Sequence, residues 1–152
     1  MIAFFEDEPG AERVAQILKA IMNRKVKGYM SVINWGEIYY NTMREQGVET
    51  AEDVIRQLKK YSIELIDADQ QLTYDAAKLK GKYKIAYADC FAAALAMRLN
   101  AFVVTGDPEF KKLKNEIKIQ WIQQNWDLID VASTLVPLTF MFSNIKRFLL
   151  SP

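Results

Sequence analysis

The feature that most constrains the fold is an apolar helical segment followed at once by an apolar strand. Residues 88–99 read ADCFAAALAMRL and are apolar on nearly every side of a helix, so we expect this helix to be central and buried. Residues 101–105 read AFVVT, a pattern typical of a strand that is covered on both faces of a parallel sheet. Together the two segments indicate an α/β core.

Strand and helix patterns alternate along the rest of the chain. Strands are expected at residues 28–32, 62–67, 101–105 and 117–122, and further helices at residues 11–25, 33–45, 50–58 and 69–82. Gly47 is expected just past a helix end, Thr50 with Asp53 resembles a capping box, and Asp69 looks like a plain helix cap. Helical connections between strands predict a three-layer α/β/α sandwich with a mostly parallel sheet.

The pattern divides the chain into residues 1–122, expected to form one domain, and an atypical tail at 123–152. The sequence has 152 residues, of which 51% are hydrophobic and 26% charged, as in a single soluble domain. The tail has no clean period, and its uncharged stretch is too short for a membrane-spanning helix. We therefore expect it to dock or to oligomerise. The acidic N-terminus does not resemble a signal peptide, so a cytoplasmic location is expected.

The residue types present exclude several kinds of chemistry. The sequence has no histidine and one cysteine, Cys90, which rules out serine–histidine and cysteine–histidine nucleophile systems, imidazole acid–base catalysis and disulfide frameworks. A net charge of +1 gives the whole chain no strong field for nucleic acid or membrane. Chemistry must therefore use carboxylates, lysines, hydroxyls or a bound metal.

Three acidic residues lie just after predicted strands or at the start of a predicted helix. Glu37 follows the first strand, Asp89 opens the apolar helix, and Asp107 comes two residues after the strand at 101–105. Ligands of open parallel sheets bind beyond the carboxyl ends of the strands, and a buried carboxylate needs a partner, for which a divalent cation is one candidate. Each residue also has a plainer interpretation, in which Asp89 and Asp107 only cap helices and Glu37 is an exposed helix residue.

Four segments together resemble the PIN domain, especially the VapC-type toxins of prokaryotic toxin–antitoxin systems. They are residues 2–12 (IAFFEDEPGAE), 31–40 (SVINWGEIYY), 86–96 (AYADCFAAALA) and 103–110 (VVTGDPEF). The resemblance covers residues 2–122, and it is the order and spacing of the segments that make it specific. It implies a ribonuclease in which acidic residues bind Mg2+ or Mn2+, with a homodimer and an antitoxin protein as expected partners.

By this resemblance Glu37, Asp89 and Asp107 occupy the second, third and fourth acidic positions of the family, and Thr105 the hydroxyl position beside the last one. The resemblance implies that Glu37 and Asp89 hold the principal ion. Asp107 would hold a second ion or orient a water, with Thr105 in support. Hard cations with oxygen ligands perform such hydrolysis without histidine.

The sequence departs from the family at its start, because the usual first strand, which ends in an aspartate and lies in the middle of the sheet, has no counterpart before Ile2. Residues 127–133 loosely resemble that strand, with Asp130 at the acidic position. A parallel return across the sheet takes about a dozen residues, and only four or five are present before this segment. An antiparallel insertion, a swap into another subunit or a tail that covers apolar surface is therefore expected more readily.

Basic and aromatic residues near the acidic positions bear on the substrate. A basic rim for RNA phosphates is one interpretation of eight lysines, and a solvated surface is the other; they are Lys78, Lys80, Lys82, Lys84, Lys111, Lys112, Lys114 and Lys118. Tyrosines able to stack on bases or to serve in packing are Tyr39, Tyr40, Tyr83 and Tyr87.

The sequence also leaves two other functions open. The first is a catalytically inactive module of the same fold, which lacks the first aspartate but still dimerises or binds an antitoxin. The second is a nucleotide-binding protein, which has less support because neither G-x-G-x-x-G nor G-x-x-x-x-G-K-[ST] is present.

Overall fold

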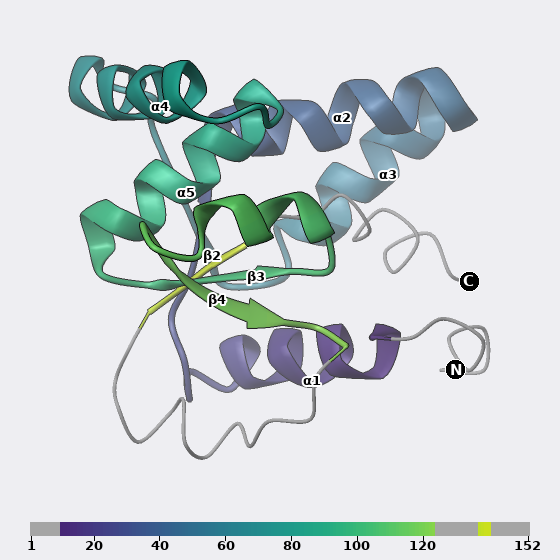
Figure 1. The fold of residues 1–152 in the computed structure, drawn as a ribbon. Helices are drawn as coiled ribbons and strands as arrows, with labels where there is room; N and C mark the ends of the chain where they lie inside the picture. The colour runs from purple at the N-terminus through teal and green to yellow at the C-terminus, as the bar shows by residue number, and fades with distance from the viewer. Residues whose placement is uncertain (1–9, 124–136, 141–152) are drawn as a thin grey trace.

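A sheet of short parallel strands forms the middle layer of the protein (Figure 1). The structure is a computed structural model that describes residues 10–123 and 137–140. The strands are β1 (Gly28–Ser31), β2 (Ile63–Ile66), β3 (Phe102–Thr105), β4 (Lys118–Trp121) and β5 (Leu138–Phe140). They lie in the order β2-β1-β5-β3-β4, and every pairing is parallel. The predicted strands and the parallel sheet are confirmed.

Helices cover both faces of this sheet. They are α1 (Ala11–Met22), α2 (Val32–Gln46), α3 (Val48–Leu58), α4 (Gln70–Lys82), α5 (Tyr87–Leu99) and the short 3-10 helix η1 (Pro108–Leu113). None of the helices within the described ranges is long and apolar enough to cross a bilayer.

The sheet has an apolar core on each face, because successive strand side chains point to opposite sides. Met30 and Val104 pack in one core with α1 and α3. Tyr29 and Val103, their neighbours in sequence, pack in the other with α4, α5 and η1. Buried side chains run without a break from Asp89 to Ala96 along α5, as expected for a central helix. The three-layer α/β/α sandwich predicted from the sequence is therefore confirmed.

The central strand β5 comes from the tail. Leu138 pairs with Gly28 of β1 on one side and with Phe102 of β3 on the other, so β5 alone joins the two halves of the sheet. The expectation that the tail would not enter in parallel within its own chain is wrong. The strand begins at Leu138 and not near residue 127, so the chain after Trp121 is long enough for a parallel crossover. Residues 127–133, with Asp130, lie outside the described residues.

The junction between α2 and α3 differs from the predicted capping box. Gly47 has φ of 90° and serves both as the C-cap of α2 and as the N-cap of α3, a left-handed conformation that glycine adopts without strain. Helix α3 therefore begins at Val48, and Thr50 lies inside its first turn, where its hydroxyl donates to the Gln46 carbonyl at 3.0 Å. The role expected for Gly47 is confirmed, and the cap expected at Thr50 is wrong.

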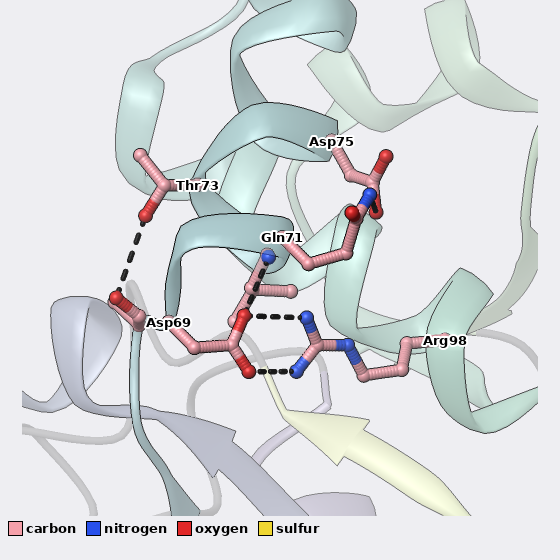
Figure 2. A network of polar contacts seen from close by, with 7 residues as sticks. Asp69, Gln71, Thr73, Asp75 and Arg98 are labelled. Carbon is pink, nitrogen blue, oxygen red and sulfur yellow. Dashed lines mark hydrogen bonds and ion pairs between the residues drawn. The ribbon is translucent and has the colours of Figure 1, made fainter.

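An ion pair fastens α4 to α5 (Figure 2). As predicted, Asp69 caps α4, with its Oδ1 accepting from the Leu72 backbone N–H at 2.7 Å. Both carboxylate oxygens of Asp69 also accept from Arg98 of α5 at 2.8 Å. These contacts hold the pKa of Asp69 well below its usual range, first through the Arg98 hydrogen bonds and then through Leu72. One side chain thus orders the start of α4 and its position against the helix that carries Asp89.

Replacing Asp69 with alanine is expected to lower the melting temperature by roughly 2–5 °C, because a helix cap and a bidentate pair are lost together. Asp53→Ala is the matched control, since it removes only the exposed pair with Arg56 on α3 and exposed pairs contribute little. Melting followed by circular dichroism at pH 7 measures both variants. Equal melting temperatures for the two would contradict the role given to Asp69.

Candidate functional site

The carboxyl ends of β1 and β3 carry two buried hydroxyl groups that shape the loops after them. Ser31 Oγ accepts from the Ile33 backbone N–H at 3.1 Å and caps α2. Thr105 Oγ1 accepts from the Asp107 backbone N–H at 3.0 Å. The two residues are each 1% exposed. They set the direction in which the chain leaves the sheet toward the acidic residues.

Asp89 is the most perturbed of the predicted site residues. It lies in the first turn of α5 and is 4% exposed. Burial, and after it the charges of Glu37, Asp107 and Glu109, raise its pKa to about 7. Ala86, not Asp89, is the N-cap of α5, but the Asp89 carboxyl group accepts a hydrogen bond from the Ala86 backbone, so its capping interpretation holds in part. Within the described ranges no lysine or arginine pairs with Asp89, so acidic neighbours surround it without a compensating cation.

Glu37 lies one turn into α2 and is half-buried, not exposed as its plainer interpretation held. Burial raises the pKa of its carboxyl group, and a hydrogen bond from the side-chain amide of Asn34 partly opposes that rise. Asn34 in turn donates through Nδ2 to the Ala88 carbonyl at 2.9 Å. This contact ties α2 to the start of α5 and brings Glu37 near Asp89.

Asp107 is the N-cap of η1, with its Oδ1 accepting from the Glu109 backbone N–H at 2.8 Å and Pro108 in the first turn. Its predicted capping role is confirmed, and its charge also reaches Asp89. The turn before it is tight, because a Cβ on Gly106 would lie 2.8 Å from Ile122 Cδ1. A side chain at position 106 would therefore require the Ile122 and Gln123 side chains to shift.

Most of the lysines predicted to form a basic rim have partners within the protein. Lys82 donates to Glu116 at 2.7 Å, and Lys80 to the Ile85 carbonyl at 2.6 Å. The others with such contacts are Lys78 with Asp75, Lys112 with Glu109 and the Lys84 carbonyl, and Lys118 with Asn100. Intramolecular contacts therefore account for five of the eight. The exposed side chains of Lys84, Lys111 and Lys114 are the better candidates for phosphate contacts.

The four tyrosines divide in the same way. Tyr39 donates its hydroxyl to Glu52 at 2.8 Å and Tyr83 to Glu116 at 2.6 Å, so both serve the fold. Tyr40 and Tyr87 are 46% and 44% exposed. Tyr87 begins α5, two residues before Asp89, and its ring meets that of Phe91 edge-on with centroids 5.1 Å apart, so of the two exposed tyrosines it is the one on the helix that carries Asp89.

The side chains at this site offer oxygen atoms, which are the ligands that hard divalent cations prefer. Glu37 and Asp89 supply carboxylate oxygens, and the buried Asn34 Oδ1 has no hydrogen-bond partner among the described residues. No three acidic, cysteine or histidine side chains in the described part of the chain lie close enough together to share one ion. The structure thus brings Glu37, Asp89 and Asp107 into one electrostatic neighbourhood without gathering them around a single point.

Sequence reasoning missed two members of this neighbourhood, Asn34 and Glu109. Asn34 precedes Glu37 by three residues, a spacing that places both on one side of a helix, so helical periodicity contained the signal. Glu109 follows the cap Asp107 by two residues, and its effect on Asp89 depends on how η1 folds back toward α5. Nothing local in the sequence indicates that approach.

Comparison with known proteins gives one match. The family model described as PIN domain matches residues 1–116. No curated protein and no solved structure matches the chain. The matched range ends before β4 and does not include β5, so the central strand of the sheet lies outside the part that the family model recognises.

Proposed function

The chain belongs to the PIN domain family, and from this membership we propose that it is a ribonuclease that depends on Mg2+ or Mn2+. PIN domains are typically nucleases and generally use divalent metal ions. The finer proposal, a VapC-type toxin that forms a homodimer and is controlled by an antitoxin protein, rests on the four sequence segments that resemble such toxins.

The observation that carries the proposal is the state of Asp89. A carboxylate that is almost fully buried, beside three other acidic residues and with a pKa raised to about 7, is unfavourable unless its charge is compensated. Perturbed acidic groups of this kind are typical of functional sites. A divalent cation compensates that charge and suits oxygen donors.

The proposed roles follow from where the residues lie. Glu37 and Asp89 would hold the ion. When bound, the ion would activate a water and neutralise charge on the scissile phosphate. Asp107 would orient the attacking water, and Thr105 would keep Asp107 in place through the hydrogen bond to its backbone N–H. Tyr87 would stack on a base of unpaired RNA, with Lys84 and Lys111 near the phosphates.

Cleavage of a labelled single-stranded RNA by the purified chain tests this proposal. We expect cleavage with Mn2+ or Mg2+, none with EDTA, and a loss of about ten- to a hundredfold in Glu37→Gln, the size that groups around a metal site typically contribute. Glu64→Gln, which changes an exposed acid on the edge strand β2, is the control and should cleave like the original chain. Cleavage that survives both EDTA and Glu37→Gln would overturn the proposal.

A catalytically inactive PIN-fold module is the second candidate, and two observations favour it. The described residues hold no set of three acidic side chains close enough to share an ion, and the sequence after Phe140 contains no acidic residue. This candidate predicts that the chain neither cleaves RNA nor binds Mn2+ but still dimerises in sedimentation experiments. Turnover that depends on Glu37 would exclude it.

A further inference from the structure

Asn34 is buried in an unusual state. Its side chain is 2% exposed on α2, and its Nδ2 donates to the Ala88 carbonyl at 2.9 Å. Its Oδ1 is the buried side-chain nitrogen or oxygen atom that is left without a partner in the part of the chain that the structure describes. Buried polar atoms are almost always paired, so an exception needs a physical explanation.

The orientation of this amide is set by its surroundings. The Ala88 carbonyl can only accept a hydrogen bond, so the NH2 group of Asn34 must face it, and exchanging the nitrogen and oxygen atoms would place two acceptors in contact. Oδ1 is therefore the end that remains free. The amide lies between the carboxyl group of Glu37, whose pKa it lowers, and residue 88, next to Asp89 in the first turn of α5.

The groups that the Asn34 amide contacts, the Ala88 carbonyl and the Glu37 carboxyl group, are themselves acceptors and face its NH2 end, so neither can satisfy Oδ1. Glu37 and Asp89 are carboxylates when ionised, and the Ala88 carbonyl already receives Nδ2. Among the described residues Asn34 Oδ1 is thus an unpaired acceptor next to other acceptors, and a bound cation would satisfy it. Carbonyl oxygens of asparagine are ordinary ligands of hard divalent cations, and a neutral ligand adds no further negative charge to a site that already holds two carboxylates.

We infer that Asn34 Oδ1 is a ligand of the divalent cation, completing a site whose other protein ligands are Glu37 and Asp89. The inference rests on the proposed metal-dependent function and deepens it. It also gives a reason why no three acidic side chains gather around one point in the described residues, since the third oxygen comes from an amide.

Titration calorimetry with Mn2+ alone tests this inference, together with the rise in melting temperature that saturating Mn2+ produces. Asn34→Leu keeps the approximate volume and removes the oxygen, so we expect affinity for Mn2+ to fall at least about tenfold. Asn34→Asp keeps an oxygen at the same place. We expect it to retain Mn2+ binding and to gain more in melting temperature from Mn2+ than the original chain, because the ion then relieves an added buried charge.

Thr42→Val is the matched control, because Thr42 is a buried polar residue of the same helix whose hydroxyl is already bonded to the Ile38 carbonyl at 2.7 Å. It should leave the affinity for Mn2+ unchanged. If the original chain binds Mn2+ and Asn34→Leu binds it equally well, the role of Asn34 is overturned and the proposed function stands. If the original chain binds no Mn2+, the proposed function fails and the inference fails with it.

Discussion

Asp89→Asn is expected to stop RNA cleavage and, in the absence of metal, to make the protein more stable at pH 8. The loss of cleavage follows from removing a proposed metal ligand and should reach about a hundredfold, the upper end of what groups around a metal site contribute. The gain in stability follows from removing a buried charge among acidic neighbours. Replacing one residue would therefore change activity and stability in opposite directions, as expected for a residue kept for function at the expense of the fold.

The pH dependence of this gain follows from the sign of the pKa shift. The pKa of Asp89 is raised from 3.8 to about 7 in the folded protein, so the folded state holds its proton more tightly than the unfolded state does. Its favourable contribution is present below about pH 4 and is lost as the pH rises to about 7. Asp89→Asn should thus match the original chain near pH 4. Its free energy of unfolding should exceed that of the original chain by about 2–4 kcal/mol at pH 8.

Urea unfolding in EDTA at pH 4, 6 and 8 measures this difference. Asp75→Asn is the control, because contacts with Lys78 and Gln71 lower the pKa of Asp75 and its replacement should not stabilise the protein at any of these pH values. A gain in stability for Asp89→Asn that is the same at pH 4 and pH 8 would contradict the assigned cause. So would a loss of stability at pH 8.

Thr139→Pro is expected to destabilise the protein by about 3 kcal/mol or more and to lower its melting temperature by roughly 10 °C. Thr139 is the middle residue of β5, which has β1 on one side and β3 on the other. Because β5 has a paired strand on each side, the backbone N–H of Thr139 points toward either β1 or β3. Proline removes that N–H and leaves a buried carbonyl unpaired.

Thr139→Val separates the backbone effect from any effect of the side chain, because valine keeps the N–H and favours strands. Its melting temperature should stay close to that of the original chain. A chain that ends at residue 123 gives a second comparison, since the two halves of the sheet would then lack the strand between them, and we expect it to lose cooperative unfolding. Cooperative melting of that shorter chain at an unchanged temperature would show that β5 is not required.

The contrast between β3 and β5 shows how far the sequence predicts the fold. Strand β3 follows a helix with a strong pattern and consists of apolar residues that suit burial on both faces, so local pattern and tertiary role agree. Strand β5 has three residues in a segment without a clean period. What makes it a strand is the space between β1 and β3, and that space depends on the whole fold, not on the local sequence.

The acidic site divides in a similar way. The sequence predicts Glu37, Asp89 and Asp107 as neighbours because parallel strands bring the ends of distant segments to one edge of the sheet. The raised pKa of Asp89 reflects the charges of the other two. Asn34 was not found, because an asparagine on a helix is usually a surface residue. Its importance depends on burial and on the Ala88 carbonyl, 54 residues further along the chain. The assignment of Glu37, Asp89 and Asp107 as metal ligands and catalytic residues stays a prediction.

Anomalous scattering from crystals soaked in MnCl2 shows directly whether Glu37 and Asp89 hold a divalent cation. We expect an anomalous peak within about 2.5 Å of oxygens from Glu37 and Asp89, with Asn34 Oδ1 on the same ion, and no peak there in Asp89→Asn crystals. A well-ordered site that shows no peak at saturating Mn2+, or a peak only at exposed acids elsewhere, would contradict this expectation.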